Sequence, residues 1–136
     1  MQAETSHIDE LLECLVFLTR FYGVPNSQDA LTTGLPLVSG RLSTALFSRA
    51  AERGGLSARE VIQPLENISP LLLPCVLQTR HGGACILLEW SKDRSQAKVI
   101  FPQAGDAAQW VSTAQLGDEY NGRLFFVKKQ FKFDER

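Results

Sequence analysis

The sequence has few of the residues and little of the net charge that identify several protein classes. It contains two histidines, three cysteines and one methionine, and its formal net charge is −1 at pH 7. This charge excludes the strongly basic surface of most nucleic-acid-binding proteins, so we expect no nucleic-acid partner. No continuous apolar run approaches the ~18 residues of a membrane span, so we expect no direct membrane insertion. The N-terminus lacks the basic start and apolar run of a secretion signal, which leads us to expect an intracellular protein.

The few cysteines do not form a disulfide or metal pattern. Cys14, Cys75 and Cys85 each lie in an apolar stretch, and none has a second cysteine or a histidine at ligand spacing. This pattern predicts reduced thiols packed in a core, with no metal and no cofactor. The chain has 136 residues, of which 44% are hydrophobic. These values predict one compact domain over residues 1–136.

The first part of the chain has the apolar spacing of helices. Residues 6–22 are apolar around most of a helical circumference, which predicts a central, buried helix with Ser6 as its N-cap and Gly23 as its stop. Ser27 and Ser43 have the position of N-caps for two further helices.

From about residue 57 to residue 129 the pattern changes to short strands. The segments CVLQTR and ACILLEW flank His81-Gly82-Gly83, which predicts a β-hairpin. SAREVIQ, AKVIF, QWV and RLFFVKK predict further strands, and Ser112 predicts the cap of one helical turn ending at Gly117. Helices followed by antiparallel strands indicate an α+β fold.

Several strings match one family in order and spacing. The segment 9–15 corresponds to a motif Asp-Cys-Gly-x-x-Cys-Leu, Phe21-Tyr22-Gly23 to a Tyr-Tyr-Gly helix end, and Leu73-Pro74 to a strand start. In these features the chain resembles the bacteriocin-processing cysteine peptidase domains at the N-termini of some ABC exporters. The resemblance implies a papain-like fold, in which a central helix packs on an antiparallel sheet.

The chain departs from this family at every catalytic position. The resemblance places Glu10 where the family has its nucleophilic cysteine, Ala84 where it has histidine, Pro102 where it has aspartate, and Glu4 where it has the oxyanion-hole glutamine. Thiolate catalysis needs a cysteine, a base and a group that orients the base. We therefore expect a degenerate peptidase domain that is not an enzyme.

The strings LLECL, GRLS, ISPLLLP and KFDER resemble one subgroup, the type I secretion exporters of repeat-rich calcium-binding toxins and adhesins. The resemblance implies a domain that docks the unfolded secreted polypeptide at the cytoplasmic face of the bacterial inner membrane. Its other partners would be the transmembrane and ATPase domains of the same transporter, and ATP would bind only to that ATPase domain. Two alternatives stay open: a module that contacts only other transporter parts, and an active thiol peptidase that uses Cys14.

Aromatic residues at the ends of elements, and polar residues beside the hairpin, are candidates for substrate contact. Alternation along the strand predicts that Trp90 shares a face with Ile86 and Leu88. The predicted substrate-binding residues are Phe21, Tyr22, Gln78, Thr79, His81 and Trp90.

Overall fold

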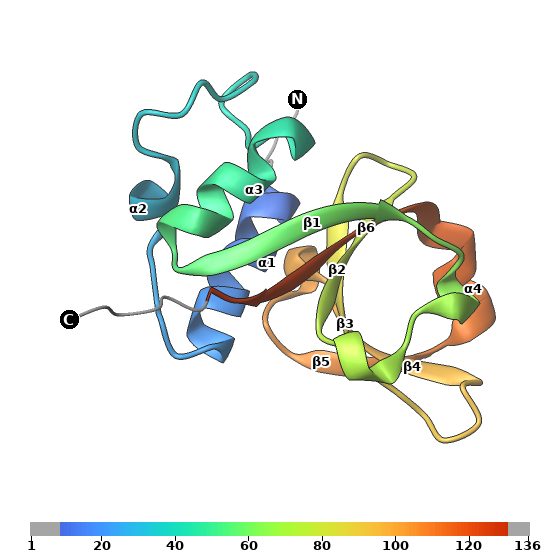
Figure 1. Ribbon diagram of the computed structural model, residues 1–136. Helices are drawn as coiled ribbons and strands as arrows, with labels where there is room; N and C mark the ends of the chain where they lie inside the picture. Colours follow the sequence, from blue (N-terminus) through green and yellow to red (C-terminus); the bar gives the residue numbers. More distant parts are fainter. Residues whose placement is uncertain (1–8, 131–136) are drawn as a thin grey trace.

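The central feature of the structure is one curved antiparallel sheet with helices packed on it (Figure 1). The structure is a computed structural model, and it describes residues 9–130. Within this range the sheet has six strands in the order β1-β6-β2-β3-β4-β5. The strands are β1 (Leu56–Ile62), β2 (Cys75–Thr79), β3 (Ala84–Trp90), β4 (Gln96–Ile100), β5 (Ala108–Ser112) and β6 (Tyr120–Lys129).

Helical segments cover both faces of this sheet. One face packs against α1 (Glu10–Phe21), and α3 (Thr44–Arg53) packs on β1, with α2 (Gln28–Thr32) beside them. The other face is closed by η1 (Leu65–Asn67) and α4 (Thr113–Glu119), which contribute Leu65 and Leu116 to the core there. The short turns η2 (Pro70–Leu72) and η3 (Pro102–Ala104) lie at the margins. The predicted α+β fold is therefore confirmed.

Two apolar cores form because side chains alternate along the strands. Val76 points toward the helices, whereas Cys75 and Leu77 point to the opposite core. Under the helices the fully buried ring of Phe47 stacks on Phe125, with ring centroids 4.2 Å apart. Because both faces are covered, every residue of β2 is buried.

The central helix begins later than predicted. Its first residue is Glu10, and the carboxylate of Asp9 caps it by accepting a hydrogen bond from the N–H of Leu12 at 3.2 Å. The prediction of a start at Ser6 is wrong, because Asp9 is the residue that leaves the helical conformation and caps the first turn. Ser6 itself lies outside the described residues. Within these residues, no helix is long and apolar enough to cross a membrane.

Two local predictions also need correction. The helix capped by Ser112 continues through Gly117 to Glu119, so it does not end at the glycine. Trp90 does not share a face with Ile86, because a β-bulge between Leu87 and Glu89 shifts the pairing of β3 with β4. One extra residue in a strand reverses the facing of all that follow.

We predict that Asp9→Ala destabilises the fold by ~2 kcal/mol, since two hydrogen bonds are lost together. Besides capping Leu12, the Asp9 carboxylate accepts the N–H of Leu42 at 2.7 Å and so ties α1 to the segment before α3. Urea unfolding measures the change. The matched control is Ser27→Ala, which removes the single capping bond of the short helix α2. A loss for Asp9→Ala no larger than for the control would contradict this role.

Candidate functional site

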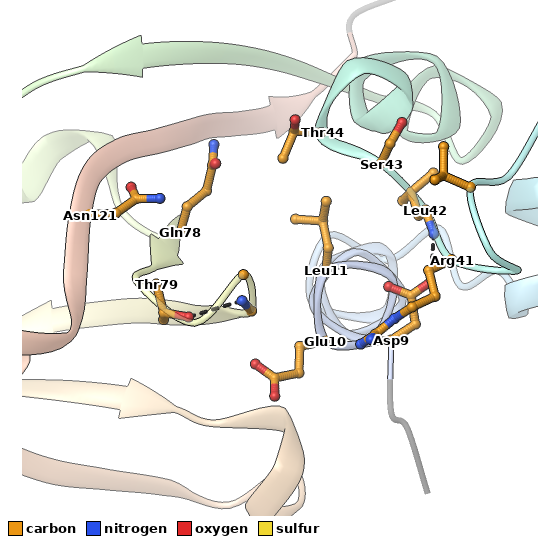
Figure 2. Close-up of a pocket in the computed structure, with 13 residues that line it drawn as sticks. Asp9, Glu10, Leu11, Arg41, Leu42, Ser43, Thr44, Gln78, Thr79 and Asn121 are labelled. Carbon is orange, nitrogen blue, oxygen red and sulfur yellow. Dashed lines mark hydrogen bonds between the residues drawn. The ribbon is translucent and has the colours of Figure 1, made fainter.

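The start of α1 meets the β2–β3 hairpin at one corner of the molecule (Figure 2). There the backbone N–H of Ala84 donates a hydrogen bond to Oε1 of Glu10 at 3.0 Å. The hairpin is held from its other side by Thr79, whose Oγ1 accepts the N–H of Gly83 at 3.0 Å. The two positions that the resemblance aligns with nucleophile and histidine are therefore in direct contact.

The two glycines of the hairpin have different roles. Gly82 has φ +80°, a left-handed conformation that the tight turn needs and that favours glycine. Gly83 leaves space for a neighbour: a Cβ added there would overlap Oε1 of Glu10 and lie 2.8 Å from its Cδ. The carboxylate thus fills the volume beside the turn, and a side chain at position 83 would force it to move.

A small cavity of about 280 Å³ lies beside this contact. Gln78, Thr79 and Asn121 line it from the sheet side, and Glu10 and the segment 41–44 line it from the helical side (Figure 2). Gln78 is buried, and its side-chain N–H donates to Oε2 of Glu60 at 2.7 Å. The structure therefore brings together the predicted residues Gln78 and Thr79 with Glu10 and Ala84.

All three thiols of the chain are buried, as predicted. Burial raises the pKa of Cys14 well above its usual value, and nearby Cys85, Glu10, Glu13 and Asp9 raise it further. Burial, then Glu10 and Glu119, raise the pKa of Cys85 to about 12. A nucleophilic thiol needs the reverse environment, with a cation or a base that favours the thiolate.

Pro102, His81 and Trp90 do not line this cavity. Pro102 begins η3, which packs against α1, and Glu4 lies outside the described residues. His81 is exposed at the hairpin tip, with Nε2 3.8 Å from Oε1 of Glu119. Trp90 is buried in the core facing away from α1, and its indole N–H donates to the carbonyl of Ile68 at 3.0 Å. Trp90 is therefore a core residue.

A second hollow, which we call the leucine groove, lies where α1 ends. Tyr22 forms part of it and donates its hydroxyl to the carbonyl of Val127 at 2.9 Å, while Phe21 packs edge-on against Tyr22. The groove has a volume of about 470 Å³, and two of its leucines are unusually open: Leu71 is 91% exposed and Leu72 48%. The leucine groove is lined by Tyr22, Ser57, Arg59, Leu71, Leu72, Leu73, Phe126, Val127 and Lys128.

The sequence predictions identified only Tyr22 of this groove, with Phe21 beside it. A usable signal was present in the string ISPLLLP, where three leucines stand between prolines in a segment too short for a strand or a helix. Apolar residues in such a segment cannot all turn toward the core. Among residues 9–130, no group of three or more His, Cys, Asp or Glu side chains is placed to hold a metal ion.

Comparison with solved structures identifies the architecture. No family model and no curated protein matches the chain. Solved structures do match: the peptidase domain of Streptococcus ComA, a bifunctional ABC transporter involved in quorum sensing, has a TM-score of 0.75 at 13% identity, covering 93% of this chain and 96% of its own. A double-glycine-motif protease from an AMS/PCAT transporter has a TM-score of 0.74 at 13% identity, covering 93% and 89%. At this identity the likeness shows the fold alone, which is that of transporter peptidase domains.

A much nearer relative shows the family. The N-terminal peptidase C39-like domain of the toxin secretion ATP-binding protein from Vibrio parahaemolyticus is 40% identical, with a TM-score of 0.87. The match covers 92% of this chain and 100% of that domain. The chain belongs to the family of peptidase C39-like domains of ABC transporters.

We predict that Gly83→Ala and Glu10→Ala are energetically coupled. Gly83→Ala alone should cost ~1–3 kcal/mol, because its Cβ overlaps the carboxylate. Glu10→Ala alone should cost ~1–2 kcal/mol through the lost bond to Ala84. The double variant should lose ~1 kcal/mol less stability than the two single losses added together, since the overlap between the Cβ and the carboxylate disappears.

Urea unfolding of the four proteins measures this coupling. Gly117→Ala is the control, because a Cβ there meets only Leu65, at an ordinary 3.9 Å. Additive losses for the two substitutions would show that Glu10 does not fill the space beside Gly83.

Proposed function

We propose that this chain is a non-catalytic docking domain of a type I secretion ABC exporter, which holds an unfolded secreted polypeptide at the cytoplasmic face of the inner membrane. The family membership supports a place in an ABC transporter, and the Vibrio relative is by its description part of a toxin secretion protein. The double-glycine-motif protease was solved in complex with its leader peptide, so a domain with this fold can bind a peptide.

The absence of catalysis is supported by the corner where α1 meets the hairpin. Position 10 carries a carboxylate whose oxygen is used by the Ala84 N–H, and position 84 carries a methyl group that cannot act as a base. Cys14 is fully buried, and the carboxylates of Asp9, Glu10 and Glu13 disfavour its thiolate. These features support the proposal that the corner has no nucleophile.

The observation that carries the docking role is the leucine groove. Leu71 and Leu72 expose apolar surface beside Tyr22 and Phe126, and a soluble domain gains nothing from this exposure unless something binds there. The walls of the groove are the strands β1 and β6 and the 3-10 turn η2, and an extended chain that runs beside these strands suits it better than a folded partner.

The charged residues around the leucine groove indicate which kind of polypeptide segment binds there. Arg59 lies with its guanidinium 5.9 Å from the centre of the Phe126 ring, and Lys128 is exposed on the same rim. An apolar floor with a cationic rim favours a segment in which apolar and acidic residues are mixed. Binding should be weak, because an unfolded chain loses entropy when it is ordered. Weak binding still raises the concentration of cargo beside the transporter.

We predict that Leu71→Ser combined with Leu72→Ser weakens binding of an unfolded, calcium-free fragment of a repeat-rich secreted protein about thirtyfold, since each leucine contributes ~1 kcal/mol of apolar burial. Titration followed by NMR measures the affinity and maps the surface. Ile62→Ser is the matched control, because Ile62 is 70% exposed and lies outside the groove.

Equal weakening by the control would show that the groove is not the docking surface. If the fragment does not bind the wild-type domain at all, the domain would instead be a module that contacts only other parts of its transporter.

We predict that iodoacetamide labels none of the three thiols in the folded domain and labels all three in urea. The reason is that Cys14, Cys75 and Cys85 are buried with raised pKa values. Mass spectrometry counts the adducts. Labelling of Cys14 in the folded state, together with cleavage of the unfolded fragment, would establish an active thiol peptidase.

A further inference from the structure

The two edges of the sheet are protected to very different degrees. At one end, β1 carries Arg59 and Glu60, and α3 packs along it, with the Ser48 hydroxyl donating to the carbonyl of Ala58 at 3.0 Å. At the other end, β5 contains no charged residue and is exposed along almost all of its length (Figure 1). Folded proteins normally shield an edge strand with charges, prolines or a covering element. The open edge of β5 therefore calls for an explanation.

The pairing register shows which backbone groups of β5 point outward. The N–H of Thr113 donates to the carbonyl of Ser95, and the register pairs Val111 with Ala97 and Gln109 with Val99. In an antiparallel ladder these alternate pairs exchange the hydrogen bonds. The residues between them direct their backbone groups to the open side.

The outward groups are the N–H and C=O of Ala108 and Trp110, and the N–H of Ser112. Among residues 9–130, no hydrogen bond is made to any of them. They form a ready template for one more strand.

The surroundings of β5 suit the side chains of an added strand. On one face a cavity of about 350 Å³ lies between β5 and α4, lined in part by Val111, Leu116 and Phe101. On the opposite face the Trp110 side chain is 46% exposed. A strand that pairs with β5 would place alternate side chains in the cavity and on the indole.

We propose that the β5 edge binds an extended segment of the exported polypeptide as a seventh strand. This inference rests on the proposed docking function. It gives the polypeptide a second contact, at the β5 edge, besides the one in the leucine groove. Backbone pairing suits an unfolded cargo, because every stretch of such a chain offers the same N–H and C=O groups whatever its side chains. Two weak contacts on one chain also reinforce each other.

The length of the edge argues against a second copy of the domain as the occupant. Two β5 strands would pair over only Ala108–Ser112. The surface that such a pair buries is far smaller than the roughly 1,200 Å² that a specific, stable interface buries. A contact of this size is adequate for a cargo that must be released again.

Amide hydrogen exchange tests the proposal on the wild-type domain. In the free domain, Gln109 and Val111 should exchange slowly, and Ala108, Trp110 and Ser112 quickly. Adding the unfolded, calcium-free fragment of a repeat-rich secreted protein should slow the second set about tenfold and leave the first set unchanged. Unchanged exchange of the second set, while the fragment still binds the groove, would overturn the edge proposal and leave docking intact.

A proline pair provides the matched variants. Ala108→Pro removes an outward N–H without taking a bond from β4, a position where an edge strand tolerates proline. It should weaken fragment binding about fivefold. Ile62→Pro makes the same change on the outer side of β1 and should have no effect. If both proline variants weaken fragment binding equally, the proposal is wrong. It is also wrong if amide exchange at Ala108, Trp110 and Ser112 slows when the domain concentration is raised without any fragment. Absence of any fragment binding would overturn both the edge and the docking proposals.

Discussion

The hydrogen bond from the Ala84 amide to the Glu10 carboxylate joins the start of the central helix to the sheet. The carboxylate lies in the first turn of α1, where the helix dipole favours a negative charge, and it also positions the start of β3. Several other features follow from it. The carboxylate occupies the space beside Gly83, it lines the neighbouring cavity, and it raises the pKa values of Cys14 and Cys85 further.

Because the Glu10 side chain occupies this corner, our proposals place the partner on other surfaces of the domain. The leucine groove and the β5 edge are at different strands of the same sheet, and each is left uncovered by the helices. One offers apolar side chains with a cationic rim, and the other offers backbone groups. In our proposals these two surfaces recognise the general properties of an unfolded chain, which are its apolar residues and its peptide groups, and neither requires a particular sequence.

Much of the fold was predictable because apolar residues follow the periods of helices and strands closely. All six strands were predicted near their observed positions, and the hairpin was signalled by Gly82 and Gly83. The start of α1 was missed because Ser6 and Asp9 are both good caps, and only the additional bond from Asp9 to Leu42, distant in sequence, favours one of them. The face of the sheet on which Trp90 lies was predicted wrongly, because a β-bulge cannot be recognised in the alternation of apolar and polar residues. Of the site, the contact between Glu10 and Ala84 depended on family resemblance, while the leucine groove depends on tertiary packing of turns.

The position of β6 has a consequence for how the protein is made. This strand is the last described element, yet it lies inside the sheet between β1 and β2 and contributes Leu124 and Phe125 to the two cores. Until it leaves the ribosome, α3 and β1 on one side and β2 to β5 on the other have no shared strand to join them. The sheet can therefore be completed only after β6 has been synthesised and inserts between the two parts.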